Sequence, residues 1–160
     1  PVRKAGKDDK GRWANIIITC TDNIRSRLDL WRLLKNSRNV TATDQTTPFY
    51  WMDFGNAQFT GQVLVGTIRD KIAQPSSKEF IAMPKMNVIT EEVSYSTLRD
   101  TDSGPSCSLA EALHKQDLFV NSMLAQAGCE ILWKMIREGR TLYRGAYLNM
   151  ETLRLTPIPV

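Results

Sequence analysis

Hydrophobic and polar positions follow several distinct patterns along the chain, and the first of them predicts strand, helix and strand. Residues 13–20, WANIIITC, form an almost wholly apolar run, which is typical of a strand buried on both faces in a parallel sheet. From Ile24 to about Arg38, apolar residues recur at helical spacing among basic ones, which predicts an amphipathic helix. Residues 39–43, NVTAT, predict the next strand. This order is typical of an α/β fold with a parallel sheet.

The pattern changes in the middle of the chain. Two antiparallel strands are predicted within residues 48–68, because β-forming residues flank the turn-rich stretch DFGNAQFTG. Residues 70–107 show no sustained periodicity beyond a short candidate strand at MNVIT, residues 86–90. We therefore expect a long loop over 70–107, and long loops in compact domains are often functional.

Helical periodicity returns after this loop. Ser108 and Glu111 match the S-x-x-E capping signature, an apolar stripe follows from Val120 to Ile136, and Gly139 supplies a stop. The last residues, 140–160, predict a closing hairpin that turns at 149–152. The whole is expected to be one α/β domain preceded by an irregular basic lead-in over residues 1–13.

Composition narrows the function classes. The chain has 160 residues and a net charge of +4, and no basic stripe with interleaved aromatic residues follows the basic start PVRKAGKDDKGR, so nucleic acid is not an expected partner. No apolar run approaches the length of a membrane span and no signal-peptide pattern is present, which favours a cytoplasmic protein without a membrane partner. The three cysteines are widely spaced and there is one histidine, so neither zinc nor a disulfide framework is expected.

The most informative polar pair is Asp22–Asn23, placed where the first strand ends and the helix begins. Ligands of open α/β sheets bind beyond the carboxyl ends of parallel strands, close to helix N-termini. Free N–H groups there favour phosphate oxygens, and a carboxylate can hold the accompanying magnesium. The alternative is that one of the two residues merely caps the helix.

The cysteines and tryptophans differ in their surroundings. Cys107 lies just before the predicted helix cap, where a lowered thiol pKa would favour nucleophilic attack, or where it is simply a small residue ahead of the cap. Cys20 is expected to be buried and inert in its strand, and Cys129 to be a packing residue on the long helix. The tryptophans at 31, 51 and 133 are expected to be core or interface anchors, and Trp51 is the one best placed for a partner surface.

An ordered set of motifs resembles a known family. ITCTDNIRSR is similar to the D-C-T-D-N-x-x-x-R stretch of the ThiF/MoeB family, the bacterial relatives of ubiquitin-activating enzymes. GNAQFTGQVLV resembles that family's strand pair, SCSLAEAL its loop cysteine before a long helix, and YRGAYLNMETLRLTPIPV its closing hairpin. The resemblance covers roughly residues 14–160, and the combination is most similar to the ThiF-type subgroup of the PRTRC systems of bacterial mobile elements.

This resemblance implies an activity and its parts. Such proteins use ATP and magnesium to join AMP to the C-terminal carboxylate of a small ubiquitin-like or sulfur-carrier protein, and they are usually homodimers. By match to the motif, Asp22 is the expected magnesium and nucleotide residue, Asn23 contacts the nucleotide, and Arg27 supports the structure or the phosphates. Cys107 matches the loop cysteine that accepts the acyl group in some members. The expected fold is the second half of a Rossmann-like ThiF/MoeB-type domain.

The chain also departs from the family pattern. The glycine-rich nucleotide loop and the phosphate-binding arginine and lysine, which the family places before the Thr-Asp-Asn strand, have no counterpart in the short lead-in. Residues 14–160 are therefore expected to be the C-terminal part of a longer adenylating domain, inactive by themselves. The two Cys-x-x-Cys pairs that hold zinc in many relatives are missing too. A non-catalytic module that binds a ubiquitin-like partner is the alternative function.

Overall fold

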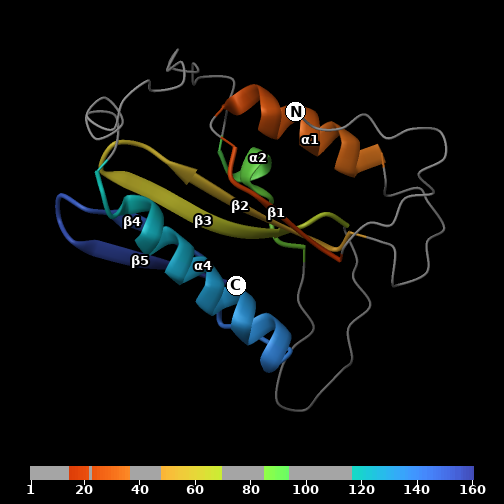
Figure 1. Ribbon diagram of the computed structural model, residues 1–160. Coiled ribbons are helices and arrows are strands. Elements are labelled where there is room, and N and C mark those ends of the chain that lie inside the picture. Colours follow the sequence, from red (N-terminus) through yellow and green to blue (C-terminus); the bar gives the residue numbers. More distant parts are fainter. Residues whose placement is uncertain (1–14, 22, 37–47, 70–84, 94–116) are drawn as a thin grey trace.

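The centre of the structure is a five-stranded mixed sheet (Figure 1). The computed structural model describes residues 15–21, 23–36, 48–69, 85–93 and 117–160. Within them the strands lie in the order β1-β2-β3-β4-β5, with β1 and β2 parallel and every other neighbouring pair antiparallel. The structure is thus an α/β protein with a mixed sheet.

Strand β1, Ile16–Thr19, pairs with β2, Tyr50–Asn56, and helix α1, Ile24–Asn36, comes between them in the chain. The parallel partner of β1 is therefore β2; residues 39–43, where the pattern predicts the next strand, lie outside the described residues. The prediction that β1 is buried on both faces is wrong, because Ile18 is 49% exposed. Among the described strands β1 pairs only with β2, so it forms an edge of the sheet.

The antiparallel part of the sheet follows the sequence pattern closely. Strand β3, Thr60–Thr67, returns beside β2 as predicted, and β4, Tyr143–Asn149, forms the closing hairpin with β5, Arg154–Pro159. The hairpin turns where expected: the backbone N–H of Thr152 donates to Asn149 Oδ1 at 3.1 Å.

The core lies on both faces of the sheet. Helix α1 and the short helix α2, Ile89–Glu92, cover one face through Trp31, Leu34, Val88 and Ile89. Helix α4, Val120–Arg137, lies across the other face and packs mainly over β3 and β4. As Figure 1 shows, the sheet is thereby enclosed between α4 and the α1–α2 pair.

Two glycines fix the position and the length of α4. A Cβ on Gly128 would lie 2.3 Å from Phe54 Cζ, so only glycine allows the helix to approach β2 this closely. Gly139 has a φ of +66°, the left-handed conformation that commonly ends a helix, and it ends α4 as the sequence predicts. The predicted cap at Ser108 and Glu111 lies outside the described residues.

The candidate strand over residues 86–90 is a wrong prediction. Met86 lies beside Thr67 at the end of β3, Val88 is extended, and α2 begins at Ile89. The Thr67 hydroxyl accepts from Met86 N at 3.0 Å and donates to Met86 O at 3.1 Å, and Thr67 N donates to the same carbonyl at 2.9 Å. A side chain thus satisfies backbone groups of Met86 that a strand ladder would otherwise satisfy.

No helix among the described residues combines the length and the apolar character needed to cross a lipid bilayer.

Candidate functional site

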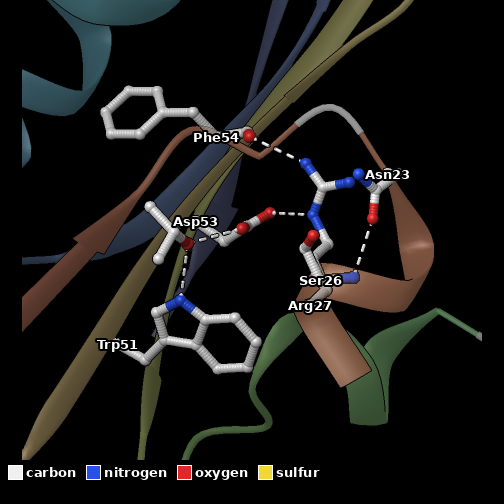
Figure 2. A network of polar contacts seen from close by, with 7 residues as sticks. Asn23, Ser26, Arg27, Trp51, Asp53 and Phe54 are labelled. Atoms are coloured by element: carbon white, nitrogen blue, oxygen red, sulfur yellow. Dashed lines mark hydrogen bonds and ion pairs between the residues drawn. The ribbon is translucent and has the colours of Figure 1, made fainter. Parts of the chain in front are cut away.

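A buried polar network fastens the carboxyl end of β1 (Figure 2). The Thr19 hydroxyl donates to Asp53 Oδ1 at 2.7 Å, directly across the parallel ladder, and Trp51 Nε1 donates to the same hydroxyl oxygen at 2.7 Å. From α1, Arg27 Nε donates to Asp53 Oδ2 at 2.9 Å and Arg27 Nη2 to the backbone oxygen of Phe54 at 2.9 Å. One helix and two strands are therefore joined where β1 ends.

The ion pair within this network is almost fully buried. Arg27 is 7% exposed and Asp53 is 1% exposed. Burial raises the pKa of the Asp53 carboxyl above its ordinary value of 3.8, while the Arg27 guanidinium and the Thr19 hydroxyl act in the opposite direction. Removing either partner would leave a buried charge without compensation.

The structure therefore places Arg27 inside the protein, bonded to Asp53 and to the backbone of β2. The prediction that Trp51 offers a partner surface is wrong, because the side chain is 1% exposed. It stacks on Trp31 with ring centroids 6.0 Å apart, so the apolar run around Trp51 builds the core beneath α1.

The turn between β1 and α1 comes directly after this network. Asn23 Oδ1 accepts the backbone N–H of Ser26 at 2.8 Å, the geometry of a residue that caps a helix N-terminus (Figure 2). Of the two roles that the sequence leaves open for this pair, Asn23 thus performs the capping role. Asp22, the expected magnesium residue, lies outside the described residues.

A pocket of about 430 Å³ lies between the carboxyl end of β1 and α4. Its volume falls within the range of small-molecule sites. At the polar part of the lining, Asn56 Nδ2 donates to Asn121 Oδ1 at 2.5 Å. The buried Thr21 hydroxyl has no hydrogen-bond partner among the described residues. The lining residues are Ile18, Cys20, Thr21, Met52, Phe54, Gly55, Asn56, Asn121, Leu124, Ala125, Gly128, Cys129 and Leu132.

The pocket has consequences for the cysteines. Cys20 is exposed and lines the pocket, so the prediction that it is buried is wrong. The residue follows the last residue of β1 rather than lying within a covered strand. Cys129 is also exposed and lines the same pocket, beyond the packing role predicted for it. Cys107 lies outside the described residues.

The lining determines what the pocket can hold. It is largely apolar and offers a hydroxyl and two side-chain amides, which suit an uncharged group such as a peptide segment or a nucleoside. The lining residues that the structure describes include no lysine or arginine, so these residues by themselves do not fit a triphosphate. In the described part of the chain, no three His, Cys, Asp or Glu residues are grouped as metal ligands would be.

Sequence reasoning missed both Asp53 and the pocket. Asp53 does carry a signal, since it is the one charged residue in the apolar run FYWMDF and must be paired when buried. No comparable signal marks the pocket, which depends on the distance between α4 and β1.

No protein-family model matches the chain, and no curated protein matches it at a significant level.

Proposed function

We propose that this chain is part of an ATP-dependent enzyme that adenylates the C-terminal carboxylate of a small ubiquitin-like or sulfur-carrier protein, on a Rossmann-like domain of ThiF/MoeB type. The observation that carries the proposal is the position of the pocket. It opens at the carboxyl end of β1, the strand of the parallel pair that leads into Thr21, Asp22 and Asn23. This is the end of a parallel strand at which α/β proteins bind ligands.

Three consecutive residues would contact magnesium and the nucleotide in this proposal. Asp22 would hold magnesium, as its match to the motif implies, and the first N–H groups of α1 favour an anionic group nearby. Asn23 accepts a hydrogen bond as the helix cap, so its contribution to a nucleotide would be a donor, the side-chain NH₂. The buried Thr21 hydroxyl is a further donor at this end of the pocket.

Arg27 has a positioning role in this proposal. It is bonded to Asp53 and to Phe54 O, which holds α1 against β2 and so fixes the first turn of the helix that follows Asp22 in the chain. The amide pair and the apolar part of the pocket suit the uncharged backbone of a carboxyl-terminal tail. ATP would supply the AMP group that activates the carboxylate, with pyrophosphate as the leaving group, and its phosphate charge would need basic groups outside the described lining.

The test is ATP–pyrophosphate exchange by the full gene product, with magnesium and a small ubiquitin-like protein encoded beside it. We expect exchange to fall at least 100-fold in Asp22→Ala, because magnesium would lose its ligand. Asp29→Ala is the matched control, since Asp29 is an exposed carboxylate on α1 that, among the described residues, pairs with the exposed Arg25 and Arg32. An Asp22→Ala variant with wild-type exchange would contradict the proposal.

A non-catalytic binding module is the second candidate, and one observation favours it. The described lining of the pocket contains no basic side chain, whereas its apolar and amide groups suit a peptide. A module of this kind would bind the ubiquitin-like protein with equal affinity with and without ATP, and the folded full product would give no exchange.

A further inference from the structure

A second hollow, of about 290 Å³, lies on the antiparallel part of the sheet. Leu64 of β3 belongs to the core beneath α1 and α2, and Gln62 lies on the same face because side chains alternate along a strand. Gln62 pairs across the ladder with Tyr147 of β4, which pairs with Thr156 of β5. The hollow shares no residue with the pocket between β1 and α4. Its side chains on this face are Thr60, Gln62, Tyr147, Asn149, Arg154 and Thr156.

These side chains offer hydrogen-bond donors that the described part of the chain does not use. The hydroxyls of Thr60, Tyr147 and Thr156 make no hydrogen bond with another described residue. Asn149 Oδ1 accepts the backbone N–H of Thr152 at 3.1 Å, which leaves the amino group of the same side chain as a donor. The hollow therefore favours a ligand that accepts hydrogen bonds.

Arg154 is the one charged side chain among the described lining residues. It forms no ion pair with any carboxylate in the described ranges. A guanidinium presents two parallel N–H groups that match the two oxygens of a carboxylate. One arginine balances one negative charge, so a carboxylate fits this lining better than a doubly charged phosphate does.

The size of the hollow and the strand beside it indicate what carries the carboxylate. Its volume of about 290 Å³ lies just below the usual range of small-molecule sites, so it suits one side chain of a larger partner. Such a partner is not expected to add a strand along β5, because Pro157 and Pro159 lack the N–H groups of a ladder. The contacts would therefore be made by side chains on the face of the sheet.

We propose that this hollow binds an acidic side chain of a protein partner. The carboxylate pairs with the guanidinium of Arg154, and the hydroxyls of Tyr147 and Thr156 supply further donors. The side-chain amides of Gln62 and Asn149 suit the peptide backbone on either side of the acidic residue. This inference concerns a different surface from the proposed adenylation site and does not depend on it.

The experiment is an NMR titration of the full gene product with acetyl-Gly-Glu-Gly-amide and with its glutamine counterpart. We expect saturable changes of the backbone amide shifts at residues 147, 154 and 156. Affinity should be about 10-fold lower for the glutamine peptide, and about 10-fold lower for the glutamate peptide in Arg154→Gln, because each change removes the charge-assisted pair. Arg137→Gln, at an exposed arginine of α4 outside the lining, is the matched control and should leave the affinity unchanged.

Two further arms separate the peptide from a simple anion. Acetate has the carboxylate without the peptide backbone, so it should bind more weakly than the glutamate peptide. Arg154→Lys keeps the charge without the two parallel donors, so its affinity should fall between those of the wild type and Arg154→Gln. Acetate that binds as tightly as the peptide, equal affinities of the two peptides, wild-type affinity in Arg154→Gln, or no saturable change at the hollow would each overturn the proposal.

Discussion

At the scale of single residues, the carboxyl end of β1 is held by the buried carboxylate of Asp53, whose charge is balanced by Arg27. Asp53 accepts hydrogen bonds from Arg27 and Thr19, and its pKa is nonetheless raised because burial penalises the carboxylate. The folded state therefore favours protonation of Asp53. The stability that protonation contributes is present below the unfolded pKa of about 3.8 and is lost as pH rises through the folded pKa.

We predict from this balance that Arg27→Met lowers the free energy of unfolding by about 3 kcal/mol at pH 7. Because the arginine lowers the pKa of Asp53, its removal raises that pKa further and leaves an uncompensated buried carboxylate. The penalty should shrink as pH falls towards 3.8, where Asp53 takes up a proton in both states. Urea denaturation of the wild type and of Arg27→Met between pH 4 and pH 7 measures this stability penalty. The pH range is chosen because the penalty depends on the protonation of Asp53.

The double variant Arg27→Met/Asp53→Asn provides the control. A neutral amide cannot leave a buried charge, so the second substitution should restore part of the stability lost at pH 7. A penalty for Arg27→Met that is constant with pH, or a double variant less stable than the single one, would show that the charge of Asp53 is not responsible.

Asn23 gives a second prediction at this scale. Asn23→Ala should destabilise the protein by about 1 kcal/mol, because the Ser26 N–H loses its acceptor, whereas Asn23→Asp should retain the cap. Thermal unfolding of the three proteins distinguishes them. Equal stability of the alanine and aspartate variants would rule out the capping role.

The residue scale also shows what the sequence can and cannot predict of the site. A cap or a ligand at Asp22–Asn23 is predictable, because both roles follow from local order along the chain. The Arg27–Asp53 pair is not, since its members are 26 residues apart and the pairing depends on the register of β1 with β2. The exposure of Cys20 depends in the same way on the sheet edge.

At the scale of elements, the contact between α4 and β2 allows only glycine. Gly128→Ala should lower the free energy of unfolding by about 2 kcal/mol, since the added methyl group meets the Phe54 ring. Mid-helix alanine is intrinsically better than glycine, so destabilisation here would show that packing dominates. Phe54→Leu/Gly128→Ala should recover part of the loss in urea denaturation; no recovery would place the strain elsewhere.

Elements with strong periodicity were the predictable ones. Helix α1, helix α4 and the β2–β3 and β4–β5 pairs follow from apolar spacing and turn residues. The strand predicted over residues 86–90 is replaced by a single point of contact, Met86 with Thr67 through its side chain and its backbone N–H, after which α2 begins at Ile89. The prediction that β1 is buried on both faces fails because an apolar run specifies a strand but not its place in the sheet.

At the scale of the whole molecule, α4 presents apolar side chains outward. Trp133 is 59% exposed and Ile136 is 68% exposed. These exposed residues support the proposal that the chain forms a homodimer, as the resemblance implies. We predict that Trp133→Lys lowers the sedimentation coefficient to that of a monomer, because a lysine would be buried in the interface. Gln126→Lys, on an exposed position of the same helix, is the control. A monomeric wild-type protein would contradict this prediction.

The most direct test of the central claim is to map where the full gene product binds magnesium and a non-hydrolysable ATP analogue. Backbone amide chemical shifts in NMR spectra provide this map. The proposal predicts that the changes concentrate at residues 20–23 and along the pocket side of α4, and that they disappear in Asp22→Ala but not in Asp29→Ala. Changes confined to other parts of the molecule, or none at saturating analogue, would contradict a nucleotide site at the carboxyl end of β1.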